Sequence, residues 1–395
     1  MAPVTTGVVG RRWRASVTTW GAIEPWDGSP PLDWYVAADD RWHVPRHEPA
    51  VRQARVDGTP VTETRVRVPG GDVVQTVYSC ADAGGVTVIE VVNESSLPVA
   101  IAFDRRNVLT ERPIADVPIA GITLPAESFV MPLAHKARVR IGLAHGRAAG
   151  GALPARLPTA SQVARGWVAL SARASRFVLP EGEDGMSLAR RLIAERCEVV
   201  LRGARDPADD PPAFVVGAGE LVRLGEAAAP GLVEDVAVAA ETLAADARWE
   251  ADVALAAATR LLADAGEERG VRDVERIVAG RPLSSRPLSS RPVSPPPASA
   301  PNGVFAVPWL EVQFANGTRL FPGGLRRAWL GESIEAHDVP TGASSSVSLA
   351  VRWHGARPAV LWEQSGGPVR LSSPVLSPQW ESTEASGEAL WPDPR

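Results

Sequence analysis

Apolar and polar positions alternate along the chain from about Arg52 to Leu143, the period of β-strands. One face of the segment VTETRVRV is β-branched and is formed by Thr62, Thr64, Val66 and Val68. Glycine pairs at 70–71 and 84–85 interrupt the pattern before and after DVVQTVYSC, and VTVIEVV, VAIAF and ARVRIGL follow. Short strands at regular spacing are typical of a β-sandwich. We therefore expect residues 1–155 to form an antiparallel β-sandwich.

The period changes to a helical one at about Ser161, which we predict to be an N-cap. The segment SQVARGWVALSARASRF has Val163, Trp167 and Leu170 on one stripe, and MSLARRLIAERCEVVL is a second candidate helix. Prolines and aspartates at 206–212 then predict a break, and Gly217-Ala218-Gly219 predicts a loop.

The strongest helix signal covers residues 232–266, which are rich in alanine and leucine and free of proline. Its apolar stripes favour either one long helix or a pair with a kink near Asp246. EERGVRDVERIVAG adds a short final helix. Residues 160–280 therefore have room for four to five helices of about 11–12 residues each.

Residues 281–302 repeat a short Arg-Pro unit and then become proline-rich, which predicts a linker or surface loop. After it, Leu310, Val312 and Phe314 alternate as in a strand, and Asn316-Gly317 is a strong hairpin signal. A second alternation follows, with Val347, Leu349, Val351 and Trp353 on one face. The prediction is a C-terminal antiparallel β domain at 303–395, with a tail containing Trp380 and Trp391 that can fold back on it. The whole chain is then a multidomain α+β protein.

Composition narrows the functional classes. Hydrophobic residues make up 45% and charged residues 22%, as in globular proteins, and the net charge of −5 is spread over interspersed signs. This argues against a nucleic-acid surface. No apolar stretch approaches the roughly 18 residues of a membrane span, so we expect no membrane association and a cytoplasmic location. Two distant cysteines exclude a disulfide scaffold or zinc cluster.

Catalytic and cofactor motifs are absent from the sequence. It has no P-loop, dinucleotide-binding fingerprint, HExxH or GxSxG. His43 and His47 come nearest to a metal pair, but Pro45 between them prevents the helical geometry that would align both rings. We expect neither a cofactor nor a metal, and no carboxylate is distinguished as catalytic.

Aromatic residues give the most informative candidate site. Indole and phenol rings beside polar acceptors stack on the apolar faces of sugars. Such rings crowd into the first forty-odd residues, at Trp20, Trp26, Trp34, Tyr35 and Trp42. The alternative is that they anchor the N-terminal segment to the sandwich. A second candidate set lies on the C-terminal hairpin, at Arg352, His354, Trp362 and Glu363.

The segment EVVNESSLPVAIAF followed by alanine-rich helices resembles the glucoamylase-like glycoside hydrolases. The tail segments VSLAVRWHGARPAVLWE and GEALWP are similar to those of uncharacterised actinobacterial proteins. The resemblance implies an N-terminal β-sandwich before an (α/α)₆ toroid. Four to five helices are too few for that toroid, and no position matches the family's catalytic acid or base. A reduced, non-hydrolytic relative is therefore expected.

Three hypotheses follow. The leading one is a non-catalytic protein whose β-sandwiches bind a carbohydrate or a protein partner, so the flanking sheets, rather than the helices, are the expected place of the site. The second is a shortened glycosidase-like enzyme, which would need two carboxylates about 5–9.5 Å apart. The third is a scaffold that oligomerises through the 232–266 stripe. The oligomeric state itself is left open.

Overall fold

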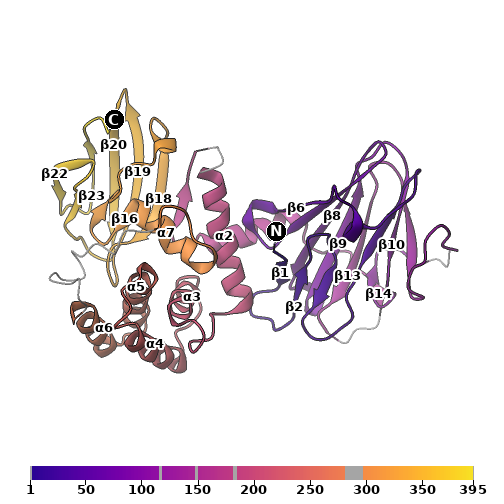
Figure 1. Cartoon of the computed structure of the whole chain (residues 1–395), viewed down its shortest axis with the longest axis horizontal. Coiled ribbons are helices and arrows are strands. Elements are labelled where there is room, and N and C mark those ends of the chain that lie inside the picture. The colour runs from indigo at the N-terminus through magenta and orange to yellow at the C-terminus, as the bar shows by residue number, and fades with distance from the viewer. Residues whose placement is uncertain (1, 115–117, 147–149, 181–184, 281–296, 395) are drawn as a thin grey trace. The chain divides into compact units, whose positions relative to one another are not determined.

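The computed structural model describes residues 2–114, 118–146, 150–180, 185–280 and 297–394. Over these residues the fold is mixed α+β, with several largely antiparallel sheets and seven α-helices (Figure 1). The chain divides into two compact units, Met1–Val168 and Ala169–Arg395. The boundary between them falls within helix α1 (Ala160–Ser171).

Unit 1 contains three sheets, and all neighbouring strands pair antiparallel except β11 and β14. The first sheet has the order β1 (Val4–Gly7), β2 (Arg14–Val17), β3 (Ile23–Pro25). The second has the order β12 (Phe129–Leu133), β10 (Val99–Phe103), β4 (Trp34–Ala37), β5 (Trp42–His43). The third has the order β14 (Gly151–Ala152), β11 (Leu109–Thr110), β13 (Arg138–Ala144), β9 (Val86–Asn93), β8 (Gly71–Cys80), β7 (Thr62–Val68), β6 (Arg52–Arg55).

The alternation in VTETRVRV is confirmed. In β7 the β-branched positions 62, 64, 66 and 68 are buried, whereas Arg67 is exposed. The main core of unit 1 takes residues from all three sheets, for example Val17, Trp34, Val66 and Phe129. In β7, period-two burial therefore fixes which face turns inward.

A chain of buried hydroxyl groups runs through unit 1. Thr6 Oγ1 lies 2.8 Å from Ser79 Oγ, which lies 2.7 Å from Thr87 Oγ1. Thr87 Oγ1 in turn lies 2.9 Å from Nε2 of His145, whose ring stacks on Trp13 at 4.0 Å between centroids. Burial, followed by the charges of Arg14 and Arg11, lowers the pKa of His145 to about 4. The imidazole is therefore neutral at pH 7.

The start and end of the first predicted helix both differ from expectation. Thr159 is the cap, because its Oγ1 accepts from the Gln162 amide and the Gln162 side chain accepts from the Thr159 amide. This reciprocal capping box leaves Ser161 inside the helix. The helix ends at Ser171, and Arg176–Val178 form strand β15 instead of a further helical turn.

Five more helices follow α1 in the segment that the sequence predicts to be helical. They are α2 (Gly185–Arg202), α3 (Pro211–Arg223), α4 (Pro230–Thr242), α5 (Trp249–Asp264) and α6 (Glu268–Gly280). The 232–266 segment is thus a pair of helices. Among the described residues of 160–280 there are six helices, and the expectation of four to five was too low because α3 was not predicted.

Helix α3 contains the Gly217-Ala218-Gly219 segment that the sequence suggested was a loop. The apparent break before it is its start, since Asp210 caps the Ala213 amide and prolines occupy the first helical turn. Ten consecutive residues from Pro212 to Leu221 are buried, so no amphipathic period marks the helix. Gly219 allows a close approach to α5, because a Cβ there would lie 3.3 Å from that of Ala257.

The C-terminal strands form two sheets in unit 2. One has the order β15, β18 (Ile334–Pro340), β19 (Ser346–His354), β20 (Arg357–Ser365), β23 (Ser386–Leu390), all antiparallel. The other has the order β16 (Ala315–Asn316), β17 (Arg319–Leu320), β21 (Leu371–Ser373), β22 (Ser377–Ser382), with β17 and β21 parallel. The predicted tail does fold back, since Trp391 is buried and its ring centroid lies 5.1 Å from that of Trp380.

The predicted strand at LEVQF is wrong, because Ala306–Phe314 form helix α7. Every residue of α7 except Gln313 is buried, so the alternation of Leu310, Val312 and Phe314 is only part of a helix buried on all sides. The Asn316-Gly317 hairpin is confirmed, with Ala315 paired to Leu320. Gly317 takes a φ of 56°, which a tight hairpin turn requires.

One core joins the helices of unit 2 to its strands. It contains Phe214 of α3, Leu255 of α5, Phe314 of α7 and Leu349 of β19. Strand β15, which precedes α2 in the sequence, pairs with β18 and so ties the helical segment to the C-terminal sheet. Figure 1 shows helices α3 to α6 gathered on one side of these strands. Most of the expected linker, residues 281–296, lies outside the described part of the chain.

Candidate functional site

The N-terminal aromatic residues have different roles in unit 1. Trp34 is a core residue, 1% exposed, and its indole Nε1 donates to the Trp20 carbonyl at 2.9 Å. Trp20 is half-buried, and the guanidinium of Arg46 lies 5.1 Å from the centre of its ring. Its Nε1 donates to Asp33 at 3.3 Å, and Asp33 also pairs with Arg46 at 2.8 Å. Trp34 is therefore an anchor in the core, whereas Trp20 is held by its charged neighbours Arg46 and Asp33.

The other three aromatic residues lie nearer the surface. Tyr35 is half-buried, and burial, followed by the charges of Asp33 and Asp104, raises the pKa of its hydroxyl. The Nε1 of Trp42 donates to the Ala120 carbonyl at 2.8 Å. Trp26 is 47% exposed, and its Nε1 donates to Ser16. Among these rings, Trp26 offers the most open surface for stacking.

The C-terminal candidates divide between the two faces of their sheet. Arg352 forms an ion pair with Glu335, and His337 lies 3.2 Å from the same carboxylate. His354 and Glu363 are exposed. Trp362 is buried in the core of unit 2, and its Nε1 donates to the Glu384 carbonyl. The four residues therefore do not converge on one site.

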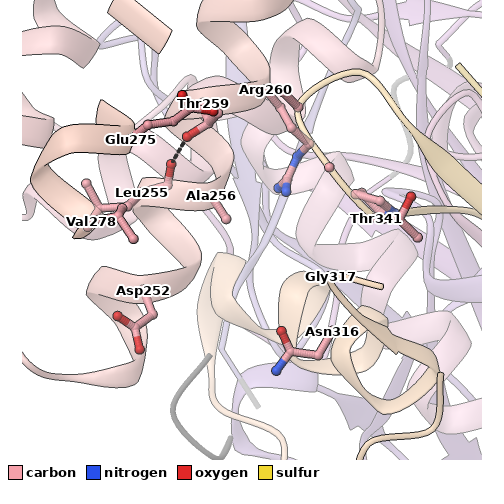
Figure 2. Close-up of a pocket in the computed structure, with 13 residues that line it drawn as sticks. Asp252, Leu255, Ala256, Thr259, Arg260, Glu275, Val278, Asn316, Gly317 and Thr341 are labelled. Atoms are coloured by element: carbon pink, nitrogen blue, oxygen red, sulfur yellow. Dashed lines mark hydrogen bonds between the residues drawn. The ribbon is translucent and has the colours of Figure 1, made fainter. Parts of the chain in front are cut away.

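A cavity of about 170 Å³ lies in unit 2, between helices α5 and α6 on one side and two loops on the other (Figure 2). We call it the α5–α6 cavity. One loop is the β16–β17 hairpin and the other connects β18 to β19. The lining residues are Asp252, Leu255, Ala256, Thr259, Arg260, Glu275, Val278, Asn316, Gly317, Pro340, Thr341, Gly342 and Ala343.

Helical spacing brings four residues of α5 to the wall of the cavity. Leu255 and Thr259 are four residues apart, as are Ala256 and Arg260, so both pairs lie along one side of the helix. The hydroxyl of Thr259 donates to the Leu255 carbonyl at 2.9 Å, and the side chain of Leu255 gives the wall an apolar surface. Val278 supplies an apolar contact from α6.

The opposite wall is held in place by its own hydrogen bonds. In the β18–β19 connection, the Thr341 amide donates to the Ser345 carbonyl at 2.9 Å. The Thr341 hydroxyl donates to Ser345 Oγ at 3.0 Å. Asn316 and Thr341 are both buried, so their polar groups are held in fixed positions at the wall of the cavity.

Arg260 is the one cation that lines the α5–α6 cavity, among the residues described. Its side chain points from α5 into the space between the helices and the two loops (Figure 2). Nε is inaccessible to solvent and has no hydrogen-bond partner. Burial, followed by the charge of Arg223, lowers the pKa of Arg260.

A buried network of charges lies beside Arg260. Arg196 donates from Nε to Glu220 at 2.8 Å, and Arg223 pairs with Glu220 and, at 2.8 Å, with Glu311. Ser175 donates to Glu311 at 2.6 Å. Glu220 is 4% exposed and Glu311 5%. The network therefore consists of charges that neutralise one another in the interior.

The chemistry of the α5–α6 cavity is that of binding. It combines an apolar wall with an amide, hydroxyl groups, a guanidinium and two carboxylates, those of Asp252 and Glu275. No cysteine is among the described residues that line it. In the part of the chain that the structure describes, no three histidine, cysteine, aspartate or glutamate side chains gather in a way that would hold a metal ion.

The sequence did not point to this cavity. Asn316-Gly317 predicted a turn, but its place beside α5 depends on the packing of distant segments. Arg260 carried the one available signal, since it is a charge within the apolar run of α5, at Leu255, Ala258, Leu261 and Leu262. A charge within a buried stripe needs a partner or a function.

Comparison with known proteins adds no family. No family model matches the sequence, and no curated protein matches it. None of the helices in the described residues combines the length and the apolar character that crossing a membrane requires.

Proposed function

We propose that this chain is a non-catalytic binding protein whose α5–α6 cavity takes a small polar metabolite, with carbohydrates as the first class to test. The observation that carries the proposal is a cavity with one apolar wall and several fixed hydrogen-bonding groups. Such a combination orients a small molecule and selects it by its polar groups. The resemblance to glucoamylase-like proteins supports the choice of carbohydrates.

We also propose that unit 1 is a β-sandwich. Its main core draws residues from the four-stranded and the seven-stranded sheet, which supports a β-sandwich. Trp26 is the most exposed of the candidate aromatic residues of unit 1.

Isothermal titration with glucose, maltose, trehalose, N-acetylglucosamine, gluconate and glucuronate tests the proposal. We expect saturable heat with at least one of them. The substitution Ala256→Trp would fill the cavity and remove that heat, whereas the control Ala247→Trp, at an exposed position, would retain it. Circular dichroism would check that both variants are folded. Absence of binding to the whole panel, or unchanged binding by Ala256→Trp, would contradict the proposal.

A second candidate is a shortened glycosidase-like enzyme. It is favoured by one observation, since Asp252 and Glu275 both line the α5–α6 cavity, and a glycosidase needs two carboxylates. Release of reducing sugar from oligosaccharides, lost in both Asp252→Asn and Glu275→Gln, would support it. Binding without turnover would favour the first proposal.

The scaffold hypothesis has less support. The apolar stripe at 232–266 is already used inside unit 2, where Val236, Ala240, Leu243, Leu255 and Leu261 are all part of the core. An oligomer formed through this stripe would have to expose that core first.

A further inference from the structure

Arg260 has an unbalanced charge. The residue is half-buried, and its Nε is sealed from solvent and has no hydrogen-bond partner among the described residues. A buried N–H group without a partner is costly, so natural proteins pair such groups or use them to bind a ligand.

The neighbouring acidic residues do not form an ion pair with Arg260. Glu220 is bound by Arg196 and Arg223, and Glu311 is bound by Arg223. Asp264, one turn further along α5, is exposed to solvent and so offers only a screened charge.

The buried network is balanced without Arg260, since Arg196 and Arg223 face Glu220 and Glu311. Arg260 adds a further positive charge beside it, on the wall of the cavity. Of the two carboxylates that line the same cavity, Glu275 is exposed and Asp252 is half-buried, so solvent screens their charges.

The surroundings of Arg260 favour an anion over water alone. Leu255, Ala256 and Val278 form an apolar wall, which weakens screening and strengthens an ion pair. Arginine presents its N–H groups as a planar fork that matches a carboxylate or phosphate. Asn316 lines the same space.

We propose that the ligand of the α5–α6 cavity is a small organic anion whose carboxylate or phosphate group pairs with Arg260. This inference rests on the proposed function and narrows the ligand class. A single negative charge on the ligand would pair with the guanidinium of Arg260.

Matched pairs of ligands test the inference in the full-length protein. Glucuronate and glucose differ by a carboxylate, and glucose 6-phosphate replaces that group by a phosphate. We expect the wild-type protein to bind at least one of the two anions about 100-fold more tightly than glucose, and to lose affinity as salt is raised. The anion that binds identifies which of the two groups the cavity prefers.

The substitution Arg260→Met should abolish this preference, whereas the control Arg248→Met, at the exposed N-cap of the same helix, should leave it intact. Without ligand, Arg260→Met should unfold at an equal or higher temperature than the wild type, because an unpaired charge has been removed. A merely structural arginine would give the opposite shift.

The outcomes separate the two proposals. Equal binding of glucose and both anions, or a retained preference in Arg260→Met, would overturn the anion inference while leaving a binding protein. Failure of every sugar, neutral or charged, would instead overturn the proposed function and this inference with it.

Discussion

The buried network around Glu220 makes a sharp prediction about stability. Glu220 is 4% exposed and lies between the guanidinium groups of Arg196 and Arg223. The substitution Glu220→Gln keeps the shape of the side chain and removes its charge. Arg196 then retains Glu311 at 3.8 Å, and Arg223 retains Glu311 at 2.8 Å. Two buried cations would share one carboxylate.

The magnitude follows from the proton affinity of the group. Burial opposes the charged form, but Arg223 and Arg196 outweigh it and lower the pKa of Glu220 from 4.5 to about 2. A tenfold change in proton affinity is worth about 1.4 kcal/mol, so the ionised form of Glu220 stabilises unit 2 by about 3 kcal/mol at pH 7 relative to the protonated form. Breaking a buried ion pair costs about 3–5 kcal/mol in other proteins, which agrees.

Urea unfolding followed by circular dichroism at 222 nm measures this effect, since most helices belong to unit 2. We expect Glu220→Gln to lose about 3 kcal/mol at pH 7, and the exposed control Glu241→Gln to lose less than about 0.5 kcal/mol. Because the folded pKa is depressed, the stabilisation is present above pH 4.5 and is lost as the pH falls through 2. The gap between wild type and variant should therefore shrink with acid. A gap that is absent at pH 7, or that does not change with pH, would refute the reasoning.

Three further predictions concern stability. Stability of unit 1 should fall as the pH drops from 6.5 through 4, because the fold holds His145 neutral. His145→Gln should weaken this pH dependence in thermal melts, and an unchanged pH dependence would contradict the prediction. Gly219→Val should cost about 1–3 kcal/mol in urea unfolding by crowding α5, whereas Gly217→Ala should be tolerated; equal losses would count against this packing. Thr159→Ala should cost about 1 kcal/mol by removing the cap of α1, and Ser161→Ala should cost little; the reverse order in urea melts would restore Ser161 as the cap.

The sequence determined the local periods of this protein. Alternating burial in β7 and β19 followed directly from residues such as Val66 and Val351, because a strand with one buried face must alternate. The helical character of 232–266 and the Asn316-Gly317 hairpin were also visible, since helix propensity and turn chemistry act over a few residues. The structure decided that this segment forms two helices rather than one.

Only the tertiary structure decided the elements that are buried on every side and the groups that meet across the chain. Helices α3 and α7 have no extended polar face, so no period distinguished them from a loop or a strand. The α5–α6 cavity brings Arg260 beside Asn316 and Thr341, which lie on distant segments of the sequence. A charge can be read from a sequence, but whether it has a partner depends on which distant segments pack against it.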